Sequence, residues 1–152
     1  MIIGKINLIN SAATKYVKKY TKSFFISNFD NMDFSEAKDY IVERLVKELP
    51  RNLYYHGAHH TFDVVKSVHS LSVAEKLTNA DFFVLLTAAY FHDAGYVYRY
   101  EHNEPIAVKM ARQCLPGFGY SNEQMDIIEG IIMATSHSCL LYTSPSPRDR
   151  SL

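Results

Sequence analysis

Three side chains of the types that bind metal ions, His60, His92 and Asp93, are expected at inward-facing helical positions. His92 and Asp93 directly follow an almost wholly apolar run over residues 82–91. A helix that is apolar on all sides lies in the middle of its domain, so this run should carry the pair into the interior. An unpaired carboxylate is costly there, and a bound cation is one of the few groups that stabilise it. Gly95 would then let the chain turn out of the helix, so that both side chains reach one ion.

His60 heads the apolar stripe of the preceding helix, which we predict over about residues 59–77. On a helical wheel, three later apolar residues lie within about 80° of it, so His60 faces inward. These residues are Val64, Val68 and Leu71. If the helix extends to His56, that residue lies one turn earlier on nearly the same face. His69 lies on the opposite, solvated side.

Two imidazoles and one carboxylate, with no thiolate, suit a divalent metal ion. Manganese, iron, zinc and magnesium are all compatible with these ligand types. Three protein ligands leave coordination positions for water and substrate, and such an ion lowers the pKa of bound water and neutralises phosphoryl oxygens. The alternative for one interior histidine is a hydrogen-bonded core residue, and adjacent His-Asp pairs also occur by chance. We favour the metal because both parts of the set lie on inward helical faces.

Helical periodicity and capping residues predict an all-α fold with five or six helices. Four residues or pairs should begin helices: Asp33 with Glu36, Thr78 with Asp81, Pro105, and Ser121 with Gln124. Pro50 and the Pro116-Gly117 pair should end two of them. The expected helices cover about residues 33–49, 59–77, 79–91, 105–115 and 121–135.

The chain of 152 residues suits one domain, expected over residues 33–137, with a less readable N-terminal segment over 1–32. Its 16 basic and 16 acidic residues give zero net charge, which predicts neither a nucleic-acid nor a membrane partner. Lysines between residues 15 and 22 form either a solvated helix face or a contact for an anionic partner. Without a membrane-spanning run or a secretion signal, we expect a cytoplasmic protein with no disulfide.

The composition changes abruptly near Ser138. Residues 138–152 show no helical or strand period and contain two closely spaced prolines, which predicts a disordered end. They also resemble the translation of a transposon-type sequencing adapter. We therefore expect the natural chain to be interrupted near His137; the alternative is an ordinary flexible tail.

Two longer motifs resemble those of HD-domain metal-dependent phosphohydrolases. The segment Tyr55–Val65 is similar to the first motif of that superfamily, and Ala88–Tyr96 is similar to the second, which gives it its name. Shorter stretches are similar to one branch of it: Asn103-Glu104, Leu115–Ser121 and Ile132–Thr135. The resemblance covers about residues 33–137. It implies an all-helical bundle that hydrolyses phosphate esters, often of nucleotides.

The resemblance also implies roles for single residues. It makes three of them metal ligands: His60, His92 and Asp93. It places His56 and Glu104 around the site, and His56 or Asp63 is expected to orient the attacking water or the leaving group. His56, Asp63 and Glu104 are therefore the candidate catalytic residues. Two alternatives are an exposed helix start for His56 and a favourable acid at a helix N-terminus for Glu104.

The chain departs from the family at one metal ligand. The family closes its metal site with a further aspartate after the Ala-Thr motif, and here only Asp149, in the tail, follows. We therefore expect a C-terminally incomplete HD bundle. Its expected function is hydrolysis of a small-molecule phosphate ester by a metal-activated water. The alternative is a non-catalytic HD module that binds a nucleotide or a partner domain in signalling. The His and His-Asp set favours the enzyme, and the missing aspartate favours the module.

Overall fold

A computed structural model describes residues 31–136, which form an all-α fold without strands in that range. The predictions for the N-terminal segment up to residue 30 and for the tail after Ser138 fall outside the described residues. Residues 31–136 form five α-helices: α2 (Phe34–Glu48), α3 (Ala58–Ala74), α4 (Asn79–Phe91), α5 (Asn103–Cys114) and α6 (Asn122–Ala134). Two 3-10 helices connect them: η2 (Ala94–Val97) and η3 (Leu115–Phe118). Over residues 31–136, none of these helices is both long and apolar enough to cross a bilayer.

The predicted capping residues begin three of the helices. Asp33 and Thr78 each accept a hydrogen bond from the backbone N–H three residues further along. Ser121 and Gln124 form a reciprocal capping box, in which the Ser121 N–H donates to Gln124 Oε1 at 2.7 Å and the Gln124 N–H donates to Ser121 Oγ at 3.3 Å. Local sequence alone therefore sets where these helices start.

Two other helix boundaries differ from the prediction. Helix α3 ends at Ala74 rather than near residue 77, because Lys76 adopts a left-handed φ of 53° that a helix cannot accommodate. Helix α5 begins at Asn103, after His102 with a φ of 51°, so Pro105 lies within the first turn instead of opening it. The connection between α4 and α5 is consequently shorter than expected.

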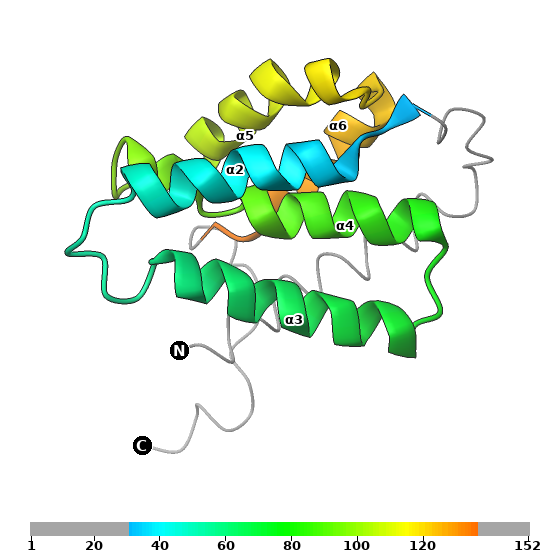
Figure 1. Cartoon of the computed structure of the whole chain (residues 1–152), viewed down its shortest axis with the longest axis horizontal. Helices are drawn as coiled ribbons and strands as arrows, with labels where there is room; N and C mark the ends of the chain where they lie inside the picture. Colours follow the sequence, from blue (N-terminus) through cyan, green and yellow to red (C-terminus); the bar gives the residue numbers. More distant parts are fainter. Residues whose placement is uncertain (1–30, 137–152) are drawn as a thin grey trace, which may run out of the picture.

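Helix α4 is the centre of the bundle. Figure 1 shows it lying between α3 and α2, and it also packs against α6. Its buried residues cover the whole circumference: Val84, Leu85, Leu86, Thr87, Ala88, Ala89 and Phe91. The neighbouring helices add Ile41, Val64, Val68, Ile128 and Ile132 to the same core. A helix that is apolar all round needs neighbours on every side, and this one has them.

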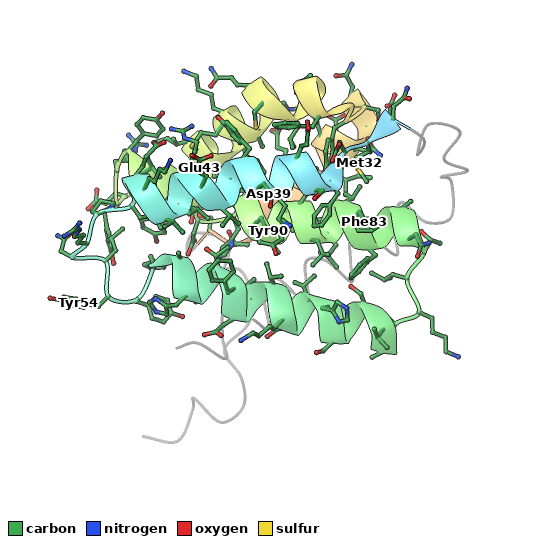
Figure 2. All side chains as sticks on the ribbon, in the orientation of Figure 1. Met32, Asp39, Glu43, Tyr54, Phe83 and Tyr90 are labelled. Carbon is green, nitrogen blue, oxygen red and sulfur yellow. The ribbon has the colours of Figure 1, made fainter. Side chains whose placement is uncertain are left out.

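Aromatic side chains hold α2 against α4. The ring of Phe34 lies 5.0 Å from that of Phe83 and 6.1 Å from that of Tyr90, in tilted arrangements. Figure 2 shows Phe83 and Tyr90 on α4, at its border with α2. Such pairs contribute about 0.5–1.5 kcal/mol each beyond the area they bury.

The expected role of Gly95 is wrong. Helix α4 ends at Phe91, and Gly95 lies inside η2 without a positive φ, so it is not the residue that turns the chain out of the helix. A Cβ atom at this position would lie 1.9 Å from the carbonyl oxygen of Asn103. Glycine is needed here because the backbone of η2 touches the start of α5.

We expect Gly95→Ala to destabilise the domain by about 1–3 kcal/mol, the usual cost of forcing extra volume into a packed site. The added methyl group would push η2 away from α5. Gly117→Ala is the matched control, because a Cβ atom there would meet no atom within 4 Å. Urea denaturation of both variants measures the difference, and equal stabilities would contradict the close-packing explanation.

Candidate metal centre

The predicted metal-binding side chains come from two neighbouring helices. His60 lies in the first turn of α3, His92 is the C-cap of α4, and Asp93 is the residue before η2. All three are buried, with 3% or less of their surface exposed. The predicted inward orientation of His60 is confirmed, and His69 is exposed as expected.

Three imidazole nitrogens surround one oxygen atom, Asp93 Oδ2. His56 Nδ1 lies 2.9 Å from it, His92 Nε2 3.3 Å and His60 Nε2 3.6 Å. His56, His60 and Asp93 alone already offer ligand atoms that all lie within 4.8 Å of one another. A buried His-His-Asp group that could hold a metal ion is therefore present.

A hydrogen bond to the backbone fixes the tautomer of His92. Its Nδ1 lies 2.7 Å from the carbonyl oxygen of Ala89. A carbonyl only accepts, so Nδ1 carries the proton and donates, which leaves a lone pair on Nε2 in the neutral ring. That Nε2 is buried and has no hydrogen-bond partner among the described residues, although Asp93 Oδ2 lies 3.3 Å away. Two electron-rich atoms face each other, and a cation between them would make this arrangement favourable.

His56 is held differently, because both of its ring nitrogens are used. Its Nδ1–H donates to Asp93 Oδ2, and the Tyr96 hydroxyl donates to its Nε2 at 3.1 Å. The rings of His56 and Tyr96 also stack, with centroids 4.1 Å apart. His56 belongs to the geometric cluster, but it is placed to orient the Asp93 carboxylate, whereas His92 presents a nitrogen to it. The group whose ligand atoms all lie within 4.8 Å of one another is His56, His60 and Asp93, so the ligand set of His60, His92 and Asp93 stays a prediction.

The distances from His60 and His92 to Asp93 can be compared with those expected around one ion. Two ligand atoms bound about 2.1 Å from one ion lie about 3.0–3.4 Å apart at octahedral or tetrahedral angles. The Nε2 atoms of His92 and His60 lie 3.3 and 3.6 Å from Asp93 Oδ2. These two distances to Asp93 thus fit a shared divalent ion to within a few tenths of an ångström.

Tyr55 and Tyr96 pack against the histidine cluster, and neither was predicted to have a role. The Tyr55 ring lies 4.7 Å from the His56 ring and 4.8 Å from the His60 ring. Burial raises the pKa of the Tyr96 phenol, and the neighbouring Asp93 and Glu104 carboxyl groups raise it further. Tyr96 therefore stays protonated and acts as the donor to His56. The sequence could have indicated a role for Tyr96, because Tyr96 lies in the same motif as Asp93.

Asp63 does not join the cluster. Its side chain is 60% exposed on the outer face of α3, and its carboxylate lies 3.9 Å from Lys66 Nζ. The structure therefore does not bring Asp63 together with the histidines, and its expected role in orienting water stays a prediction. The residue that would supply a further aspartate, Asp149, lies outside the described residues.

Glu104 lies in the first turn of α5 and is buried beside an open cavity of about 370 Å³. Seven residues line this cavity: Tyr96, Tyr100, Glu101, His102, Asn103, Glu104 and Ser136. Tyr96 belongs both to the cavity wall and to the hydrogen-bond chain that ends at Asp93. The cavity and the histidine cluster are therefore neighbours with one shared side chain.

Comparisons with known proteins do not assign the chain to a family. No protein-family model, curated protein or solved structure matches the chain at a significant level. The HD resemblance consequently rests on the two motifs, and the site geometry has to support any functional proposal by itself.

We expect Tyr96→Phe to weaken Mn²⁺ binding about tenfold, because residues that orient a metal ligand typically contribute 10–100-fold to affinity. The variant removes only the hydroxyl that donates to His56 and keeps the stacked ring. Tyr98→Phe is the control, since its hydroxyl contacts Arg44 at the surface. Isothermal titration calorimetry measures both affinities, and an unchanged affinity in Tyr96→Phe would remove the hydrogen-bond chain from the site.

Proposed function

We propose that the protein is a metal-dependent phosphohydrolase of the HD type that acts on a small-molecule phosphate ester. His60, His92 and Asp93 would hold a divalent ion. The observation that carries the proposal is the buried His92 Nε2, whose lone pair faces Asp93 Oδ2 at 3.3 Å without a hydrogen bond. The resemblance of the segments around His60 and around His92-Asp93 to the two HD motifs supports the same assignment.

A divalent ion at this site, when bound, would lower the pKa of a water molecule and neutralise charge on phosphoryl oxygens. In the net reaction, the water oxygen bonds to phosphorus, the ester P–O bond breaks, and a proton passes to the departing alcohol. The chain's own contribution is positioning. His56 holds the Asp93 carboxylate in one orientation through the 2.9 Å hydrogen bond, and Tyr96 holds His56. The rings of Tyr55 and Tyr96 exclude bulk water from one side of the cluster.

The second candidate is a non-catalytic HD module that binds a nucleotide or a partner domain. One observation favours it: within residues 31–136, the clustered ligand-type side chains include a single carboxylate, Asp93. A site of two imidazoles and one carboxylate holds an ion less tightly than one closed by a second carboxylate. Such a protein would signal by conformation and would turn over no ester.

Hydrolysis of phosphate esters discriminates the two candidates. The full chain, supplied with Mn²⁺, is incubated with a panel of phosphomonoesters and phosphodiesters, and released phosphate or alcohol is measured. We expect turnover of at least one ester that disappears with chelator and in His92→Ala but persists in His69→Ala. Binding of Mn²⁺ without turnover of any ester on the panel would favour the module.

A further inference from the structure

The cavity between η2 and α5 has an unusual lining for a protein that handles phosphate esters. Of its seven lining residues, all within the described range, two carry carboxyl groups, Glu101 and Glu104, and none is a lysine or arginine. Arg99 lies nearby in sequence, but its Nη2 donates to the carbonyl oxygen of His102 at 3.3 Å. The cavity is therefore suited to a neutral or positively charged group and not to an additional phosphate.

Two buried polar side chains of this lining have oxygen atoms that could accept hydrogen bonds from a ligand. Glu104 is 5% exposed, and its carboxyl group lines the cavity close enough to Tyr96 to raise the pKa of that phenol. Asn103 is 3% exposed and its side chain hydrogen-bonds Tyr96, but its Oδ1 has no hydrogen-bond partner among residues 31–136. Both groups are acceptors, and burying an acceptor without a donor costs free energy. A ligand that brings N–H donors would supply hydrogen bonds to these oxygen atoms.

Aromatic rings complete the cavity. The centroids of Tyr96 and Tyr100 lie 5.4 Å apart, with the ring planes inclined by 58°. Tyrosine faces attract cations, most strongly where the cation is partly removed from water. Two tyrosine rings with a buried carboxyl group and a second carboxyl group at the rim are the chemistry that recognises an ammonium group.

We propose that this cavity binds the ammonium end of the substrate, so that the substrate class is a phosphorylated amino alcohol. The inference rests on the proposed function, because it assigns the phosphoryl end to the neighbouring metal centre. Tyr96 connects the two parts, since it lines the cavity and its hydroxyl donates to His56. A nucleoside polyphosphate would instead bring additional negative charge against Glu101 and Glu104.

Binding of ethanolamine to the full chain tests the cavity without requiring hydrolysis. In ¹⁵N-resolved NMR titrations, we expect saturable shifts of the Tyr100 and Asn103 amide signals with ethanolamine and none with ethylene glycol, which has a hydroxyl in place of the ammonium group. Glu104→Gln should weaken ethanolamine binding about tenfold or more, because a hydrogen bond to a charged group becomes a neutral one. Glu75→Gln, at an exposed position at the end of α3, should leave it unchanged.

A second variant, Tyr100→Leu, tests the cavity even if Glu104→Gln does not fold. Tyr100 is exposed, so Tyr100→Leu should fold normally and still weaken ethanolamine binding severalfold through loss of the ring face. Equal shifts with ethanolamine and ethylene glycol, or ethanolamine binding that neither variant weakens, would overturn the cavity assignment.

Hydrolysis separates this inference from the proposed function. With Mn²⁺ present, we expect kcat/KM for 2-aminoethyl phosphate to exceed that for ethyl phosphate at least tenfold, with ethanolamine and phosphate as products. Turnover of both esters at equal kcat/KM would overturn the inference and keep the phosphohydrolase. Ethanolamine binding without turnover of any ester would overturn the phosphohydrolase, and with it the substrate class, and leave only an ammonium-binding cavity.

Discussion

Replacing Asp93 by Asn is expected to lower Mn²⁺ affinity more than about 100-fold, beyond the 10–100-fold that loss of an orienting neighbour typically causes. Asp93 Oδ2 is the atom around which the nitrogens of His56, His60 and His92 gather, at 2.9, 3.6 and 3.3 Å. The substitution keeps the size of the side chain and removes the only negative charge of this cluster. No other ligand-type side chain in the described cluster can replace it.

Elemental analysis and calorimetry of Asp93→Asn, His60→Ala and His69→Ala measure this effect. The first two should lose the ion, and His69→Ala should retain it, because His69 lies on the exposed side of α3. Loss of Mn²⁺ in His69→Ala, or its retention in both other variants, would show that the buried cluster does not bind the metal.

Replacing Phe91 by Ala is expected to lower the free energy of unfolding by about 3–5 kcal/mol, the usual range for emptying a close-packed aromatic site. Phe91 is fully buried and is the last residue of α4, directly before His92 and Asp93. Loss of its packing should loosen the end of α4 that carries His92, so metal affinity should fall together with stability.

Chemical denaturation of Phe91→Ala is compared with that of Val73→Ala, an exposed position on α3. The control should change stability by no more than about 0.5 kcal/mol, as is usual at the surface. If Phe91→Ala cost no more than this control, the end of α4 would not belong to the core, and the account of how α4 positions His92 would be wrong.

The sequence by itself determined the helices and their inward faces. Periodic apolar residues and caps at Asp33, Thr78 and Ser121 act within one or two turns, so they can be recognised without knowledge of the fold. The same local pattern put His60 on the buried side of α3 and His69 on the exposed side. The uninterrupted apolar run before His92 likewise indicated the central helix.

Only the tertiary structure decided how the site is assembled. The close approach of Gly95 to the backbone of Asn103 and the hydrogen bond from Tyr96 to His56 join segments whose spacing in the sequence carries no period. Asp63 is a second example of what the sequence does not determine, because its position in a motif does not reveal that its carboxylate faces solvent. Which side chains meet depends on how α3, α4 and α5 pack against one another, and that packing is set by contacts between residues far apart in the chain.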